Sequence, residues 1–307
     1  MSKPLVTVLM SVYNGGDYLA GAIESILKQT LKDFEFIIVN DGSSDKSLST
    51  IKKYAAKDPR VKLISQKNRG LVASLNRGIK SAKAEYIARQ DADDHSAPER
   101  LAKELAFLQT HPRVVLVGSS ISVMNARGQI MHRHAVLLNN PELKQELLVR
   151  SPFAHGSVMF KRAAAVKAGL YRQAAWPAED YDLWLRLSEY GDFANLDEYL
   201  YIYRQHEQGL SFKNTNLQQQ KLAAIQDKAW LEHHRLIPRV NVDFYKYHRL
   251  DLGQLRMERL FDNLLFIYKN ARRHGNNKLA AQILLRLSGK PSAYRKTAGK
   301  IRRRIRR

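Results

Sequence analysis

Residues 34 to 45 read Phe34-Glu35-Phe36-Ile37-Ile38-Val39-Asn40-Asp41-Gly42-Ser43-Ser44-Asp45, an apolar run of strand length followed by a polar turn. The Ser and Asp side chains of the turn can cap a helix, so this stretch predicts a strand that leads directly into a helix. The same alternation recurs on both sides of it. Further strands are expected at residues 5–10, 61–64, 86–88 and 114–117, and further helices around 18–27, 72–79 and 99–109. Repeated units of this size predict an α/β fold, with a mostly parallel sheet flanked by helices on both faces.

The pattern changes in the middle of the chain. We expect a hairpin from residues 121–124 and 130–132, a strand at 153–160, a helix at 179–188 and a last strand at 199–203. Beyond residue 212 the apolar spacing is helical, until Gly289-Lys290-Pro291-Ser292 breaks it. The sequence therefore predicts three parts, which are an α/β domain at 1–212, a helical C-terminal extension at 213–289 and a basic tail at 290–307.

Positive charge is concentrated in the C-terminal part. The 307-residue chain has a formal net charge of +22, and residues 213–307 hold 23 Lys and Arg against 6 Asp and Glu. This asymmetry predicts an anionic partner for that part, either a membrane surface or a nucleic acid. The chain has no cysteine, which excludes disulfides and thiolate metal sites and fits a reducing cytosol. A strand pattern stands at its start and no apolar run could cross a bilayer, so we expect neither a secretory signal nor a membrane span.

The stretch Arg89-Gln90-Asp91-Ala92-Asp93-Asp94-His95 places three carboxylates within four residues. It follows the strand expected at 86–88, and open α/β sheets bind ligands at the carboxyl ends of their strands. Crowded carboxylates repel one another and favour a hard cation such as Mg²⁺ or Mn²⁺. A solvated acidic turn that caps the helix starting near Pro98 explains the same residues equally well. The cluster alone leaves both interpretations open.

Several further motifs follow one another between residues 5 and 210. They are Val8-Leu9-Met10-Ser11-Val12-Tyr13-Asn14 with Asp17-Tyr18-Leu19, Asn40-Asp41-Gly42-Ser43-Ser44-Asp45, Asn68-Arg69-Gly70 with Asn76-Arg77-Gly78, Asp91-Ala92-Asp93-Asp94, His155-Gly156-Ser157, Glu179-Asp180-Tyr181-Asp182-Leu183-Trp184 and Tyr203-Arg204-Gln205-His206. In this order and spacing the chain resembles family 2 glycosyltransferases of the GT-A type, which transfer sugars from nucleotide-sugars. The resemblance implies a Rossmann-like GT-A catalytic domain at 1–212. It also implies a nucleotide-sugar-binding half at about 1–118 and an acceptor half at about 119–212.

The resemblance assigns the nucleotide to the ends of the first, second and fourth strands. Asp41 matches the family residue that hydrogen-bonds the base, and a carboxylate there can accept the imide N–H of uracil. Asp41 is also expected to cap the following helix. Ser11 and Tyr13 match the wall of the base pocket, and Asp91 matches a contact to the ribose. The resemblance therefore implies a UDP-sugar donor.

Asp91 and Asp93 match the family's Asp-X-Asp motif, which implies a transferase that depends on Mn²⁺ or Mg²⁺. Asp93 is the expected ligand, with Asp91 at the ribose or in the metal shell and His206 as a further ligand. Such a metal stabilises negative charge on the departing nucleoside diphosphate. Asp94 is expected to cap the following helix. Two further candidates for contacts with the diphosphate, by hydrogen bonding or by charge, are His155 and Arg204.

Asp180 matches the carboxylate that this family places at a helix start beneath the acceptor. There it can take the proton of an acceptor hydroxyl while the oxygen attacks the anomeric carbon. One displacement of this kind inverts the anomeric centre, so a single base suffices. Glu179 would orient the site or bind the acceptor, and Trp184 is expected in the core. Without the resemblance, an acid favoured by the helix dipole explains Asp180 as well.

The resulting hypothesis is an inverting hexosyl- or N-acetylhexosaminyltransferase that acts on a glycan or lipid-linked acceptor in polysaccharide, lipopolysaccharide or glycoconjugate synthesis. Each basic residue near an anionic leaflet contributes roughly 1 kcal/mol, so the tail would hold the protein peripherally at the inner, cytoplasmic face of the cell membrane. A merely solvated tail is the alternative. A basic nucleic-acid-binding protein and a non-catalytic sugar-nucleotide-binding module are rival hypotheses. Asp91, Asp93 and Asp180 argue against both, and nucleic acid is not the expected partner.

Overall fold

The computed structural model describes residues 3–147 and 150–209 and a few positions beyond them, namely 217, 218, 220–222, 224, 225, 269, 272 and 273. The chain divides into one unit at 1–238 and a second at 239–307, and the sheet with its helices belongs to the first. The predicted extension and basic tail, and the boundaries at 212 and 289, lie outside the described residues apart from those few positions. The predicted domain limits therefore stay predictions.

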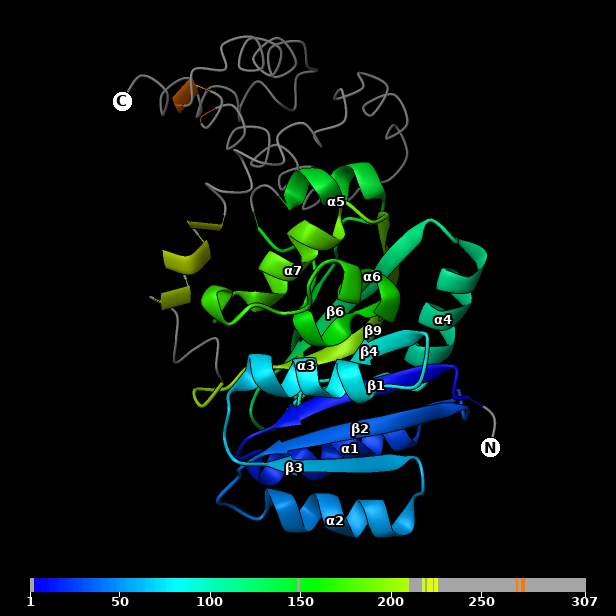
Figure 1. Cartoon of the computed structure of the whole chain (residues 1–307), viewed down its shortest axis with the longest axis vertical. Coiled ribbons are helices and arrows are strands. Elements are labelled where there is room, and N and C mark those ends of the chain that lie inside the picture. Colours follow the sequence, from blue (N-terminus) through cyan, green and yellow to red (C-terminus); the bar gives the residue numbers. More distant parts are fainter. Residues whose placement is uncertain are drawn as a thin grey trace. The chain divides into compact units, whose positions relative to one another are not determined.

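Four parallel strands form the N-terminal half of the sheet (Figure 1). β1 (Val6–Val12) lies between β2 (Phe34–Asp41) and β4 (Tyr86–Arg89), and β3 (Val61–Gln66) extends the sheet beyond β2. β1 pairs with β2 along all 7 of its residues. These strands confirm the four expected from the sequence. Because all four are parallel, their last residues meet at one edge of the sheet, here called the carboxyl edge.

The second half of the sheet mixes strand directions. β8 (Met159–Lys161) runs antiparallel to β4 and to β6 (Val114–Met124), and β9 (Asp192–Arg204) runs parallel to β6. Two reversals restore the original direction, so β6 and β9 also end at the carboxyl edge, whereas β8 begins there. The short strands β5 (His95–Ser96) and β7 (Ile130–His134) complete the order β3-β2-β1-β4-β8-β6-β9-β5, with β7 paired to β6.

The strand predicted at residues 153–160 is wrong for most of its length. His155–Ser157 form a 3₁₀ turn (η2), and only the last two predicted residues belong to β8. Gly156 and Ser157 are buried, so the segment has the apolar, small-residue composition of a buried strand without its conformation. The predicted hairpin is confirmed, and its first strand is continuous with the strand expected at 114–117.

Helices cover both faces of the sheet. One face carries α1 (Leu19–Leu27), α2 (Ser47–Lys57) and α4 (Arg100–Thr110). The other face carries α3 (Leu71–Ser81), α5 (Asn140–Glu146), α6 (Arg162–Lys167) and α7 (Glu179–Leu187). Alternate residues of β1 supply the two cores, since Val8 and Met10 pack on the first side and Leu9 on the second. The predicted α/β fold with helices on both faces is confirmed.

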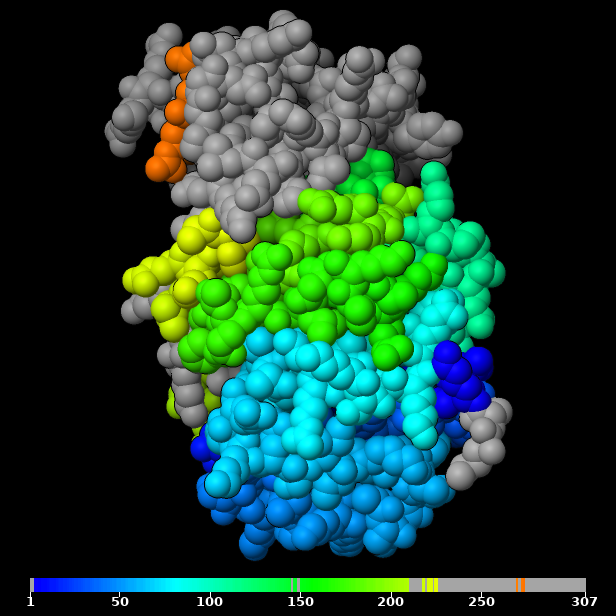
Figure 2. Space-filling view, viewed as in Figure 1, coloured from blue at the N-terminus to red at the C-terminus, as the bar shows by residue number. Residues whose placement is uncertain are grey.

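Helix α3 of the first half contacts the second half directly. The Asn76 side chain donates to the carbonyl oxygen of Tyr171 at 2.9 Å and accepts its N–H at 3.0 Å. Arg162 Nε donates to the carbonyl oxygen of Ile79 at 3.1 Å. In Figure 2 the cyan atoms of α3 lie against the green atoms of the α6 and α7 region. The two halves therefore share a helical layer as well as a sheet.

Among the described residues, no helix combines the length and the apolar character needed to cross a membrane.

Candidate active site

The predicted site residues gather at the carboxyl edge. The loop with Asp91 and Asp93 follows β4, and η2 with His155 precedes β8 at the same edge. Helix α7 begins with Glu179 and Asp180. All five side chains line one cavity of about 350 Å³. Acids that lie 86 to 89 residues apart in the sequence therefore face a common space.

The structure brings Asp93 and His206 together. Oδ2 of Asp93 lies 2.8 Å from Nε2 of His206, which follows the end of β9. Burial and the negative charge of Asp91 raise the pKa of the Asp93 carboxyl above its usual range. Nδ1 of His206 is buried and has no hydrogen-bond partner in the described part of the chain.

This pair fits a divalent cation. A cation between Asp93 and His206 would replace the proton that the two side chains share and would offset the repulsion from Asp91. Within the described ranges no three His or acidic side chains converge as a ready-made metal site. Mg²⁺ commonly takes one or two protein carboxylates and completes its shell with substrate phosphates and water. An incomplete protein site of this kind therefore suits a metal that arrives with a diphosphate.

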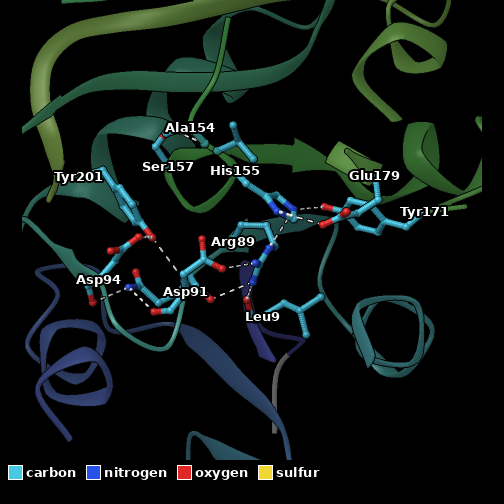
Figure 3. A network of polar contacts seen from close by, with 12 residues as sticks. Leu9, Arg89, Asp91, Asp94, Ala154, His155, Ser157, Tyr171, Glu179 and Tyr201 are labelled. Atoms are coloured by element: carbon cyan, nitrogen blue, oxygen red, sulfur yellow. Dashed lines mark hydrogen bonds and ion pairs between the residues drawn. The ribbon is translucent and has the colours of Figure 1, made fainter. Parts of the chain in front are cut away.

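Asp91 is bonded to Arg89 at the base of the cavity (Figure 3). Its Oδ1 accepts a hydrogen bond from Nη2 of Arg89, and its N–H lies 3.3 Å from the Tyr201 hydroxyl oxygen. Burial tends to raise the pKa of Asp91, but the charge of Arg89 and the hydrogen bond that it donates outweigh burial and lower it. Asp91 is therefore ionised at neutral pH and carries a fixed negative charge into the cavity.

Asp94 does not cap helix α4, so that expectation is wrong. Its side chain is buried, and its two oxygens accept the Tyr201 hydroxyl at 2.8 Å and the N–H of Arg204 at 2.6 Å. Arg204 Nε also donates to the carbonyl oxygen of Asp93 at 2.8 Å. These bonds fasten the end of β9 to the acidic loop, and His206 lies two residues further on. Asp94 thereby places His206 beside Asp93.

Glu179 and Asp180 are the first two residues of α7, and they line the same cavity as Asp91 and Asp93. Burial raises the pKa of Asp180 to about 6. Burial and the charge of Asp180 raise the pKa of Glu179 to about 8. At pH 7 the pair therefore holds one proton, with Glu179 neutral and Asp180 ionised. A carboxylate with a pKa near the working pH is suited to accept a proton from a hydroxyl.

His155 lies between the two acidic groups. Its Nε2 contacts Nε of Arg89 at 3.2 Å and the Tyr171 hydroxyl at 2.9 Å, and its Nδ1 lies 4.0 Å from Oε1 of Glu179. Burial and the charge of Arg89 lower the pKa of His155 to about 3, so the ring is neutral. Arg89 Nε–H can only donate, which makes His155 Nε2 an acceptor and leaves the ring proton on Nδ1. His155 can therefore donate to a phosphate oxygen, but its Nε2 lone pair is not available to a metal.

Arg204 lines the cavity, is buried and is largely engaged by the protein. Besides the carbonyl oxygen of Asp93, its guanidinium bonds the carbonyl oxygens of Asn125 and Ala126 and stacks 4.5 Å from the centre of the Tyr18 ring. Its positive charge remains close to Asp93.

The predicted base-pocket residues lie at the ends of β1 and β2. Tyr13 is 56% exposed, as a stacking platform requires, and Ser11 is partly buried. Asp41 does not cap α2, contrary to expectation. Its carboxylate instead accepts the N–H groups of Arg69 and Gly70 at 2.9 and 2.8 Å, which fixes the turn before α3. Trp184, as expected, is fully buried in the core.

Sequence reasoning did not single out Arg89, Tyr171 or Tyr201, although each contacts a predicted site residue. Arg89 had a local signal, because a cation at the end of a buried strand and beside an acidic cluster needs buried partners. The two tyrosines had none, since they reach the site only through the folded chain.

Comparison with known proteins identifies the family. The family model described as "Glycosyl transferase family 2" matches residues 7–170. The chain belongs to glycosyl transferase family 2. It is 41% identical over 209 residues to "Putative glycosyltransferase EpsE" of Bacillus subtilis (strain 168), covering 66% of this chain and 74% of the relative. The "Amylovoran biosynthesis glycosyltransferase AmsE" of Erwinia amylovora is 34% identical over 200 residues, covering 64% of this chain and 74% of the relative.

A solved structure supports the fold of this family 2 member. The mannosyltransferase PcManGT from Pyrobaculum calidifontis, in complex with GDP-Man and Mn²⁺, superposes with a TM-score of 0.58 at 18% identity. The match covers 96% of this chain and 83% of that structure. The GT-A fold and the family inferred from the motifs are thus confirmed, and the protein is a glycosyltransferase.

Proposed function

We propose that this family 2 glycosyltransferase is an inverting enzyme that moves a sugar from a nucleotide-diphosphate sugar to a hydroxyl of a glycan or lipid-linked acceptor. One observation carries the proposal: the acidic loop at Asp91–Asp93 and the acid pair Glu179–Asp180 line the same cavity of about 350 Å³. One acidic group suits a metal-bound diphosphate and the other suits an acceptor hydroxyl. A non-catalytic binding module would need only the first.

Asp180 is the proposed base. As the acceptor oxygen forms its bond to the anomeric carbon, the bond from that carbon to the diphosphate oxygen breaks, and the leaving nucleoside diphosphate keeps the electron pair. Asp180 takes the hydroxyl proton in the same step. Its pKa of about 6 leaves it ionised at neutral pH. Attack opposite the leaving group inverts the anomeric centre, and no covalent enzyme intermediate is needed.

Asp93 and His206 are the proposed ligands of Mn²⁺ or Mg²⁺, with Asp91 at the ribose or in the metal shell. The cation, when bound, stabilises charge on the departing diphosphate. Arg204 and the Nδ1–H of His155 supply positive charge and a hydrogen-bond donor beside the same phosphates. The Mn²⁺ in the structure of PcManGT supports a metal for this fold.

The proposed donor is a UDP-sugar, of hexosyl or N-acetylhexosaminyl type. The position of Asp41, Ser11 and Tyr13 at the ends of β1 and β2 supports a base pocket there. GDP remains the competing nucleotide, because guanine also offers a ring N–H and the donor of PcManGT is GDP-Man.

The proposed role is synthesis of a cell-surface polysaccharide, lipopolysaccharide or glycoconjugate, at the cytoplasmic face of the membrane. The role of AmsE in amylovoran biosynthesis supports it. The basic residues after position 212 supply the charge that an anionic leaflet would attract.

A donor screen tests the proposal. The full chain is heated with UDP, GDP and their sugars, with and without Mn²⁺, and nucleotides that raise the melting temperature are then assayed for transfer to added glycan acceptors. Metal-dependent stabilisation by one nucleotide, and a product of inverted anomeric configuration by NMR, are expected. Retention of configuration would refute the single-displacement mechanism, and stabilisation without any turnover would favour a binding module.

A further inference from the structure

Arg89 is a fully buried charge at the site, which contacts Asp91 directly and faces the acids of α7 only through His155. It is the last residue of β4, and its side chain is 0% exposed. Figure 3 shows its guanidinium between Asp91 and His155. Neither the motif comparison nor the proposed chemistry uses this residue.

Every nitrogen of the Arg89 guanidinium is engaged. Nη1 donates to the carbonyl oxygens of Leu9 and Gln90 at 2.9 and 2.8 Å, Nη2 to Asp91, and Nε to His155. The four acceptors lie on β1, on the acidic loop and on η2. A planar fork with fixed donor directions can hold three separate segments at set angles, which a lysine ammonium cannot do.

The contacts continue from Arg89 to the acids of α7. His155, oriented by Arg89, also contacts the Tyr171 hydroxyl, and its Nδ1–H faces Glu179 at 4.0 Å. The chain of contacts therefore runs from Asp91 through Arg89 and His155 to Glu179. It connects the side of the cavity assigned to the donor with the side assigned to the base.

We propose that Arg89 is a positioning residue, which fixes the Asp91 carboxylate and the His155 imidazole relative to one another and thereby sets the donor against the base. This inference rests on the proposed function of Asp91 and Asp180. Arg89 touches neither substrate nor metal in this scheme, and it acts through the two side chains that it holds.

Arg89 also acts on the charge state of the base. Two charged groups influence the pKa of Asp180, the buried cation of Arg89 and the anion of Asp91, while Asp180 itself raises the pKa values of the adjacent Glu179 and of the Tyr171 hydroxyl. Burial and Asp91 raise the pKa of Asp180, whereas Arg89 lowers it. Removal of the cation should therefore shift the acid limb of the pH–rate profile upward. A purely structural arginine would leave that limb unchanged.

The test compares Arg89→Lys, Arg89→Met and a control, Arg60→Met, in the full chain. Arg60 bonds Asp58 before β3, at the end of the sheet opposite the cavity. Melting temperature, kcat, donor KM and the acid limb of kcat/KM are measured for each protein. Wild-type turnover is established first, because its absence would refute the proposed function rather than the role of Arg89.

We expect Arg89→Met to lower kcat by about 100-fold and to shift the acid limb upward by about one pH unit, with a smaller change in donor KM. Arg89→Lys keeps the positive charge but not the planar guanidinium with its fixed donor directions. It should therefore retain the wild-type acid limb and still lose about tenfold in kcat. Arg60→Met should change neither quantity.

Two results would overturn the inference. One is an Arg89→Met enzyme with kcat within twofold of the control and an unshifted acid limb. The other is an Arg89→Lys enzyme with wild-type kcat, which decides the matter even when the methionine variant fails to fold.

Discussion

Lowering the pH through 6 should switch off sugar transfer by protonating Asp180. Burial places the pKa of this carboxyl at about 6, above the range of an exposed aspartate. A base works only when ionised, so its contribution is present above that pKa and is lost as the pH falls through it. About nine-tenths of Asp180 is ionised at pH 7 and about one-tenth at pH 5, which predicts a roughly tenfold lower kcat/KM at pH 5.

The assay follows release of nucleoside diphosphate between pH 4.5 and 8, with saturating Mn²⁺ and limiting donor. Two variants separate the members of the acid pair. Asp180→Asn should lower kcat by about 10²–10⁴-fold and abolish the acid limb, since it removes the base. Glu179→Gln should leave the acid limb near pH 6, because Glu179 has a pKa of about 8 and is already neutral there.

A flat profile between pH 5 and 7 would show that no group of this pKa acts as the base. If Glu179→Gln lost the acid limb of the pH profile while Asp180→Asn transferred sugar at a near-normal rate, Glu179 would be the base instead of Asp180. Circular dichroism at each pH distinguishes loss of the base from loss of the fold.

Three further outcomes are expected. Asp93→Ala should abolish transfer and weaken Mn²⁺-dependent nucleotide binding by calorimetry, with the melting temperature of the free protein preserved; unchanged metal dependence would remove Asp93 from the metal site. Gly156→Ala should be destabilised by about 1–3 kcal/mol, roughly 3–10 °C in melting temperature, since an added Cβ would lie 1.8 Å from the Tyr201 hydroxyl. Gly15→Ala is the control and should lose less stability, because its added Cβ would lie 3.2 Å from its nearest neighbour, a side-chain atom. Removal of residues 290–307 should reduce sedimentation with vesicles containing phosphatidylglycerol and spare donor hydrolysis, and equal sedimentation would refute the membrane role of the tail.

The parallel half of the fold was predictable because its signals are local. β1 to β4 are apolar runs bounded by polar turns, and the loop after β4 carries the acids that mark the site. Their placement at one edge follows from parallel pairing alone. β8 was not predictable in the same way. It has three residues, and its antiparallel pairing depends on β4 and β6, which lie far from it in the sequence.

The roles of individual acids depended on distant partners. Asp94 has the sequence context of a helix cap, but Tyr201 and Arg204, 107 and 110 residues away, make it a buried anchor. Asp41 likewise bonds backbone groups 28 and 29 residues downstream instead of the adjacent helix. Local context shows that an acid lies in a turn. Only the folded chain shows which donor it meets.

The antiparallel strand β8 has a mechanical consequence. Because β8 is hydrogen-bonded to β4 and to β6, the part of the chain with Asp93 and the part that leads to Asp180 are attached to one continuous sheet. Many enzymes close over their substrates by a hinge between two lobes. A hinge at this place would have to break the backbone hydrogen bonds between β8 and its neighbours. Admission and release of substrates therefore fall to the loops at the rim. Those loops can change with the sugar or the acceptor, while the sheet keeps the distance between the proposed metal ligand Asp93 and the proposed base Asp180 constant.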